Sequence, residues 1–299
     1  MNTPESGLQA WYKQAAVDPE RNVLNRLAQR LLIGLGQATW FLRPFPDFLI
    51  LGAQKAGTSS LYKYLLQHPA ILPAYRKEIH FFTIPALYFK GHNWYRGHFP
   101  TGWVRTQAQQ RLTGEASPSY LFFPLVPKRV HQVMPQAKLI VLLRDPVARA
   151  FSNYHHQVRR GLETLSFEEA IEQEQERLGS DLQKTIENPH FHSLNLAHFS
   201  YLLRGEYVTQ LKRWRNFFPA TQMLILKSED FYDDPQQTVM QVASFLNLSA
   251  WQPNSTIFKQ YNPGIYDKMN SQTRQRLSRY FQPANEELYE FLGRNLAWS

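Results

Sequence analysis

Residues 46–69, PDFLILGAQKAGTSSLYKYLLQHP, constrain the fold more than any other stretch of the chain. The run DFLILG, residues 47–52, is short and mostly apolar, which is typical of a strand covered on both faces of a sheet. The helical spacing of Leu61, Leu65 and His68 predicts a helix over 58–68 that ends before Pro69. A strand that turns directly into a helix is the first half of a βαβ unit, so the stretch predicts an α/β fold with a parallel sheet.

The turn between this strand and helix has the composition of an anion-binding loop. Glycines at 52 and 57 let the chain turn tightly, the first N–H groups of the helix are unpaired, and three hydroxyl side chains follow: Thr58, Ser59 and Ser60. In the P-loop of nucleotide triphosphatases a lysine follows the second glycine directly, whereas here Lys55 precedes it. At position 55 a lysine would neutralise the bridging oxygen of a phosphate anhydride as that bond breaks.

Strand and helix patterns alternate along the rest of the chain without repeats. Strands are expected at 138–143 and 222–228, a polar strand-to-loop segment at 113–122, and helices at 145–158, 166–178, 205–218, 234–247 and from 270 onward. We interpret the acidic charges of 166–178 as solvated surface, and the His-rich region 180–203 as a loop near a substrate cleft. The order predicts a single P-loop-like domain, residues 46–299, with a central parallel sheet flanked by helices, after a helical extension over residues 1–45.

Two further segments place polar side chains near the expected cleft. Arg144 ends the strand over 138–143 and Ser152 follows two turns into the next helix, and an arginine fork with a hydroxyl suits a phosphate group. The segment KEIHFF, residues 77–82, alternates, so Glu78 and His80 are expected on one face and Ile79 and Phe81 on the other. A carboxylate held beside a histidine is a candidate general base.

Charge and composition restrict the classes of ligand. The net charge of +9 suits an anionic ligand, a nucleic acid or an acidic membrane surface. Because the basic residues are dispersed and no helix-turn-helix or zinc-finger pattern occurs, no nucleic-acid partner is expected. The chain has no cysteine, and the histidines at 155, 156, 190, 192 and 198 lack the spacing of a ligand set, so no metal site is expected.

The N-terminal part leaves two interpretations open. The start of the chain lacks the charged and apolar regions of a secretory signal, so a cytoplasmic protein is expected. The apolar run over 31–42 is too short to span a bilayer. Since arginines at 21, 26 and 30 precede that run, residues 21–43 form either a basic amphipathic helix at the inner membrane surface or, as we favour, a helix packed on the domain.

Three segments together, GAQKAGTSSLYKYL, KEIHFF and LLRDPVARAFSNY, resemble the signature segments of sulfotransferases that use 3′-phosphoadenosine 5′-phosphosulfate (PAPS). The resemblance is strongest to the sulfotransferase domains of heparan sulfate N- and 3-O-sulfotransferases and their bacterial relatives, and it runs from about residue 47 to the C-terminus. It implies in-line transfer of a sulfuryl group from PAPS to a hydroxyl or amine, without a metal. The implied acceptor is a carbohydrate or glycolipid, and a small hydroxylated metabolite stays open.

The resemblance also implies residue roles. Glu78 would be the catalytic base, Lys55 would assist departure of the phosphate, and His80 would lie beside them. The residues implied in binding PAPS are Lys55, Ala56, Gly57, Thr58, Ser59, Ser60, Arg144, Ser152, Gly264 and Tyr266. This chain has Ala116 where the heparan sulfate enzymes have a lysine, and their late lysine-glycine-arginine loop corresponds here to NPGIYDKM.

Two other functions remain open from the sequence. A P-loop kinase or nucleotide hydrolase would have a lysine directly after Gly57 and an acidic Mg²⁺ ligand at the end of the second strand, where this chain has Thr58 and Arg144. A non-catalytic polyanion-binding module would lose affinity steeply as salt rises. The sequence fixes neither the acceptor nor the oligomeric state.

Overall fold

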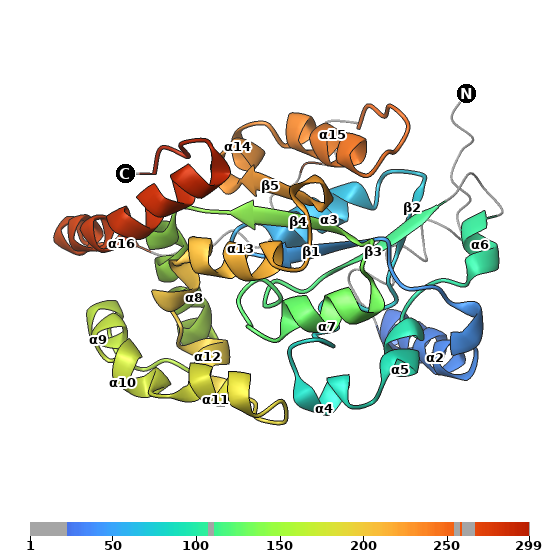
Figure 1. The fold of residues 1–299 in the computed structure, drawn as a ribbon, viewed down its shortest axis with the longest axis horizontal. Helices are drawn as coiled ribbons and strands as arrows, with labels where there is room; N and C mark the ends of the chain where they lie inside the picture. The colour runs from blue at the N-terminus through green and yellow to red at the C-terminus, as the bar shows by residue number, and fades with distance from the viewer. Residues whose placement is uncertain (1–22, 107–110, 254–257, 259–266, 299) are drawn as a thin grey trace.

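The computed structural model describes residues 23–106, 111–253, 258 and 267–298. Its five strands form one sheet in the order β2-β3-β1-β4-β5, and every neighbouring pair is parallel. The strands are β1 (Phe48–Gly52), β2 (Ile71–Pro73), β3 (Leu112–Ala116), β4 (Lys138–Leu143) and β5 (Met223–Lys227). Helices lie above and below this sheet in Figure 1. The predicted α/β class with a central parallel sheet flanked by helices is therefore confirmed.

The two central strands carry the core of the domain. All of β1 is buried, and in β4 every residue after Lys138 is fully buried. Helices cover both faces of these strands, which explains why their sequences are continuous apolar runs rather than alternating ones. The expected strands at 47–52, 138–143 and 222–228 are confirmed to within one residue. Strand β2 was not expected, because its three residues are too short to show a pattern.

Each predicted helix is present. In Figure 1 the helices are α2 (Val23–Ala38), α3 (Thr58–Leu65), α4 (Pro85–Tyr88), α5 (His92–Arg96), α6 (Gly102–Thr106), α7 (Val126–Val133), α8 (Pro146–Arg159), α9 (Phe167–Glu172), α10 (Glu174–Leu178), α11 (Asp181–Glu187), α12 (Leu194–His198), α13 (Tyr207–Arg215), α14 (Ser228–Asp233), α15 (Pro235–Phe245) and α16 (Ser271–Leu292). The predicted helix over 166–178 is divided into α9 and α10, and the helices α4 to α7 and α14 were not predicted. Short 3₁₀ turns lie at Trp40–Leu42 (η2), Leu203–Gly205 (η3) and Ala220–Gln222 (η4). Asp145 caps α8 by accepting a hydrogen bond from the N–H of Val147 at 3.0 Å.

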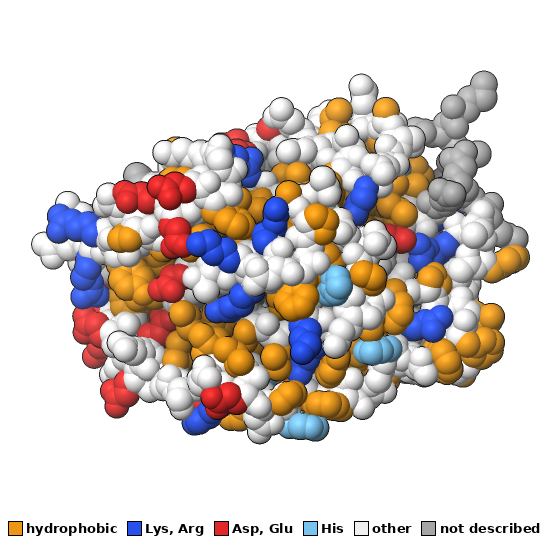
Figure 2. All heavy atoms as spheres, in the orientation of Figure 1, with side chains coloured by type: hydrophobic (Ala, Val, Ile, Leu, Met, Phe, Trp, Pro, Cys, Tyr) orange, Lys and Arg blue, Asp and Glu red, His pale blue; other side chains and the backbone are white. Residues whose placement is uncertain are grey.

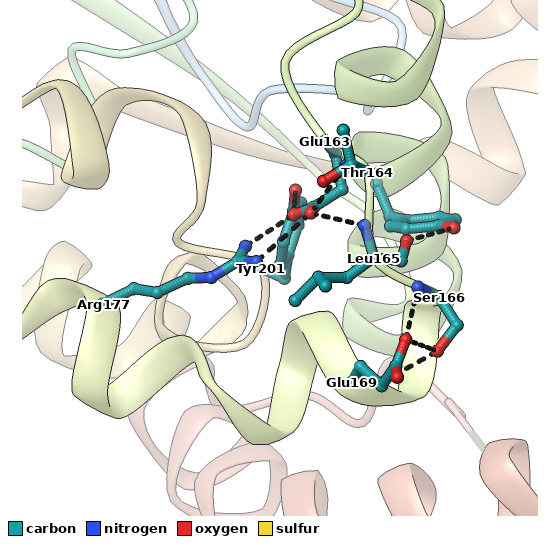
Figure 3. A network of polar contacts seen from close by, with 8 residues as sticks. Glu163, Thr164, Leu165, Ser166, Glu169, Arg177 and Tyr201 are labelled. Carbon is teal, nitrogen blue, oxygen red and sulfur yellow. Dashed lines mark hydrogen bonds and ion pairs between the residues drawn. The ribbon is translucent and has the colours of Figure 1, made fainter.

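Buried carboxylates organise the helices between β4 and β5. A capping box of Ser166 and Glu169 opens α9 (Figure 3). Beside it, Glu163 accepts hydrogen bonds from Arg177 at 2.6 Å and from the Tyr201 hydroxyl at 2.8 Å (Figure 3). The interpretation of 166–178 as solvated surface is wrong for Glu174, which is buried and accepts the N–H groups at 202 and 203.

We expected the region 180–203 to be a loop, but it contains the helices α11 and α12. Ser193 joins the two helices: its hydroxyl donates to Asp181 at 2.6 Å and accepts the N–H of Leu196 at 2.9 Å. Helices of seven and five residues are too short to produce a readable period.

Helix α2 packs on the domain beside α5, as we favoured. A Cβ on Gly36 would lie 1.9 Å from the carbonyl oxygen of Gly97, so only a glycine allows this approach of the two backbones. Within the described ranges no helix combines the length and apolarity that crossing a bilayer requires. The boundary at residue 45 and the cytoplasmic location stay predictions.

Candidate active site

A cavity of about 900 Å³ opens at the carboxyl ends of β1, β3 and β4. In open α/β sheets this edge is where ligands bind. The cavity wall includes most of the predicted site residues: Lys55, Gly57, Thr58, Ser59, Glu78, His80, Arg144 and Ser152. Segments far apart in the sequence therefore meet in one hollow.

The elbow between β1 and α3 forms one wall of the cavity. Lys55 lies in the left-handed region at a φ of 72°, and Gly57 follows at a φ of 97°. A Cβ on Gly57 would lie 2.9 Å from the Tyr232 hydroxyl, so glycine is required there by both conformation and space. Arg144 donates from Nη1 to the carbonyl oxygen of Lys55 at 2.9 Å, which ties the elbow to the end of β4.

This end of the cavity is strongly positive. Burial, with the nearby charges of Arg159 and Arg144, lowers the pKa of Lys55 to about 8, and Glu78 opposes that change. Burial and the charge of Lys55 likewise lower the pKa of His156 to about 4. Because the lowered pKa values show that positive charge is destabilised in this site, a bound anion will stabilise it.

The segment with Glu78 and His80 is a loop rather than a strand. Both residues have positive φ angles, 56° and 55°. Even so, the two side chains share one face, with His80 Nε2 3.7 Å from Glu78 Oε2, while Ile79 and Phe81 are buried. The expected side-chain arrangement is therefore present on a different backbone conformation.

A buried network holds this loop in place. The Ser117 hydroxyl accepts the His80 N–H at 3.1 Å and donates to Glu115 Oε1 at 2.5 Å. The Tyr95 hydroxyl donates to Glu115 Oε2 at 2.6 Å, and His80 Nδ1 lies 3.0 Å from the Ser119 hydroxyl. Burial raises the pKa of Glu115, and the hydrogen bonds from Ser117 and Tyr95 oppose that rise. The same bonds give the buried carboxyl oxygens the partners that they need. The loop is thereby anchored to the end of β3.

Glu78 is held in its ionised form. Burial would raise its pKa, but the hydrogen bond from His80 and the charge of Lys77 lower it to about 2. Lys77 also donates a hydrogen bond to Oε1 of Glu78. The side chain of Glu78 remains 40% accessible from the cavity, so its carboxylate is available as a proton acceptor.

Not every predicted residue reaches the cavity. Ala56 and Ser60 are buried behind its wall, and the carbonyl oxygen of Ala56 accepts a hydrogen bond from Ser228 at 2.8 Å. Gly264 and Tyr266 lie outside the described residues. Ala116, where the resemblance implies a lysine, is completely buried at the end of β3.

The structure adds cavity residues that no single motif predicted. Those with polar or aromatic side chains are Gln54, Thr83, Ser119, Phe123, His156, Arg160, His192, His198, Arg204 and Tyr232. The one signal in the sequence was the His-rich composition of 180–203, a region that we interpreted as lying near a substrate cleft and that supplies His192 and His198 to the cavity wall. No group of three His, Asp or Glu side chains is arranged to hold a metal in the described part of the chain.

Comparison with known proteins gives consistent matches. The profile of the sulfotransferase domain family matches residues 45–297. The membrane-associated sulfotransferase kil1 of Dictyostelium discoideum is 29% identical, over 85% of this chain and 66% of that protein. Heparan sulfate glucosamine 3-O-sulfotransferase 5 of Mus musculus is 26% identical, over 86% of this chain and 75% of that protein.

A solved structure supports the same relationship. The crystal structure of a sulfotransferase from Alicyclobacillus acidocaldarius aligns with a TM-score of 0.69 and 33% sequence identity, covering 85% of this chain and 98% of that one. The profile match spans the sheet, the elbow and the whole cavity wall described above. The chain therefore belongs to the sulfotransferase family, the PAPS-dependent enzymes that its three sequence motifs resemble.

Proposed function

We propose that the cavity binds PAPS together with an acceptor, and that the chain transfers the sulfuryl group to a hydroxyl or amine of a carbohydrate. One observation carries the proposal: Lys55, Arg144 and Glu78 reach the same cavity from the ends of three different segments. Relatives named as heparan sulfate sulfotransferases support a saccharide acceptor. Family membership argues against a kinase or a non-catalytic module.

The cavity wall fits a doubly phosphorylated nucleotide. Lys55, Thr58 and Ser59 lie where the N–H groups of α3 begin, and they would hold the 5′-phosphosulfate. Arg144 and Ser152 line the cavity from the end of β4 and from α8, and they would hold the 3′-phosphate. The lowered pKa of Lys55 is consistent with a pocket built to receive negative charge.

The reaction needs alignment and charge compensation. PAPS supplies the activated sulfuryl group. Glu78 would accept the proton of the attacking hydroxyl or amine, and Lys55 would neutralise the departing phosphate oxygen. His80 would keep Glu78 oriented, since the two rest side by side. Positioned acid and base groups of this kind typically contribute about 10² to 10⁴ in rate.

Another part of the cavity wall, beside His80, suits a saccharide. His192, Ser119 and Thr83 offer hydrogen-bonding groups, and Phe123 offers an aromatic face. The Nδ1 atom of His192 is buried and has no hydrogen-bond partner among the described residues. Because the imidazole of His192 lines the cavity and has hydrogen-bonding capacity left over, it is suited to bind a ligand hydroxyl.

Thermal unfolding with nucleotides tests the first half of the proposal. Adenosine 3′,5′-bisphosphate without Mg²⁺ is expected to stabilise the fold, by about 2.7 kcal/mol at a hundredfold excess over its Kd. ATP should do so only weakly. Stabilisation by Mg-ATP alone would contradict the proposal and favour a kinase.

An acceptor screen with radiolabelled PAPS tests the second half. Oligosaccharides should be labelled, while small hydroxylated metabolites serve as the competing class. The Glu78→Gln variant provides the control, because it should bind nucleotide without labelling any acceptor. Labelling confined to the small metabolites would contradict a carbohydrate acceptor and leave the cofactor site intact.

A further inference from the structure

Helix α2 contacts the domain with both polar and apolar side chains, the latter including the half-buried Leu32 and Ile33, and it exposes three leucines on its outer face. Gln29 and Gln37 donate hydrogen bonds from their side chains to backbone carbonyl oxygens of the domain, at 2.8 and 2.9 Å. Leu27, Leu31 and Leu35, spaced four residues apart on the outer face, are 50% to 70% exposed. A helix packed on a globular domain normally carries polar side chains on its outer face. The outer face of α2 is therefore suited to contact an apolar surface.

The apolar surface continues beyond the helix. Phe41 and Leu42 in η2 are exposed, and so are Trp103 and Val104 in α6. Gly102 lies against the backbone of Leu42, so α6 adjoins η2. We call these residues the α2 patch: Leu27, Leu31, Leu35, Phe41, Leu42, Trp103 and Val104. A continuous exposed apolar surface of this kind marks an interaction site.

The described segments that form the α2 patch carry basic side chains and no acidic ones. Arg26 and Arg30 are exposed next to the row of leucines on α2. The sequence contains no Asp or Glu within 21–46 or within 79–114, and Asp47 at the border is paired with Arg105. Figure 2 shows hydrophobic side chains gathered at the end of the molecule where Figure 1 places α2, with Lys and Arg side chains beside them. The surface is both apolar and positive.

We propose that the α2 patch docks on the surface of an anionic lipid bilayer. An amphipathic helix that lies in the interface combines a leucine face with arginines that meet acidic headgroups. Tryptophan is enriched at this depth, and Trp103, which belongs to the α2 patch, is 68% exposed. A protein partner would not require the uniform positive charge. The proposal uses none of the cavity residues, so it stands independently of the proposed function.

Vesicle flotation with the full chain tests the docking. Phosphatidylcholine vesicles containing phosphatidylglycerol should bind the protein, and pure phosphatidylcholine vesicles should bind it more weakly. The double variant Leu31→Gln, Leu35→Gln should lower binding at least tenfold. Leu194→Gln is the matched control, because Leu194 and Leu35 are equally exposed at 62%, and it should bind as the unaltered protein does.

A second variant separates the electrostatic contribution to vesicle binding from the hydrophobic one. Arg26→Gln with Arg30→Gln should lower binding to the anionic vesicles by about fivefold per arginine and leave binding to neutral vesicles unchanged. Brominated lipids should quench the fluorescence of Trp103, measured as the difference from Trp103→Phe. The midpoint of thermal unfolding and the far-UV circular dichroism should be the same in all variants, which shows that each is folded.

Three results would overturn the proposal. The first is no binding to either kind of vesicle. The second is equal binding by the leucine double variant and the unaltered protein. The third is a dimer in light scattering that the double variant abolishes while vesicles remain unbound, since this would assign the α2 patch to a second copy of the chain.

Discussion

Lys55 makes nucleotide binding depend on pH in a way that can be calculated. In the free protein its pKa is lowered to about 8, mainly by burial and then by the charges of Arg159 and Arg144. Phosphate groups bound beside it would return the pKa to its ordinary range or above. Binding then requires a protonated Lys55, so affinity is complete well below pH 8 and falls as pH rises through 8.

The size of the effect follows from the fraction of charged lysine. Between about pH 7 and about pH 9.5 the Kd for adenosine 3′,5′-bisphosphate should rise about thirtyfold, or about 2 kcal/mol. Neither Glu78, with a pKa of about 2, nor His156, with a pKa of about 4, titrates in that range. The loss is therefore assigned to Lys55.

Calorimetry gives the sharpest assay. At pH 8 about half of the Lys55 side chains are uncharged, so binding should take up about half a proton, seen as a dependence of the heat on the buffer. Lys55→Arg is the matched control, since arginine stays charged and should bind with little pH dependence. A Kd that is constant over this range in the unaltered protein, or an equal slope in Lys55→Arg, would refute the reasoning.

Three other substitutions follow from the same geometry. Glu78→Gln should lower turnover by about 10² to 10⁴ with unchanged nucleotide affinity. If the variant kept full activity, a residue other than Glu78 would have to be the base. Ser117→Ala should destabilise the fold by about 1 to 3 kcal/mol in urea unfolding and lower kcat more than it raises KM for PAPS, because the His80 N–H loses its acceptor. Burial raises the pKa of Glu174 to about 7 against an ordinary 4.5, so the folded protein binds the extra proton and its stability falls as pH rises from about 4.5 to 7. Glu174→Gln should remove up to about 3 kcal/mol of this fall, measured by urea unfolding at both ends of that range, and an unchanged pH profile would exclude Glu174 as its cause.

The side of the cavity that we propose binds the cofactor could be predicted because its signals are local. A buried strand, a glycine turn and a helix follow one another around Lys55, and Arg144 directly follows a second strand. Ala56 and Ser60 were placed in the same site because they belong to the motif that resembles the PAPS-binding loop, and Ser60 also because it carries a hydroxyl. Their burial shows that side-chain direction within a tight elbow cannot be derived from the motif alone.

The other wall could not be predicted, because its residues come from separate segments. Thr83, Ser119 and His192 share no sequence period and meet only through the packing of loops and short helices. For the loop that contains Glu78, the sequence predicted the direction of the side chains but not the conformation of the backbone. The period-two alternation correctly placed Glu78 and His80 on one face. In the structure this arrangement comes from their positive φ angles and from the hydrogen bond of the His80 N–H to Ser117, and not from a strand.

This division of the cavity predicts that acceptor and cofactor recognition can be altered separately. His192 lies between α11 and α12, in a segment held by Ser193 and Asp181, with no part of the β1–α3 elbow in that contact. The His192 side chain lines the cavity, so His192→Ala should raise the KM for the acceptor at least tenfold through the loss of one hydrogen bond from the imidazole. The Kd for adenosine 3′,5′-bisphosphate should stay within about twofold, as expected for sites that share no partner. A matching loss of nucleotide affinity would show that the two ends of the cavity form one coupled site, because the wall between α11 and α12 would then be positioning the elbow as well.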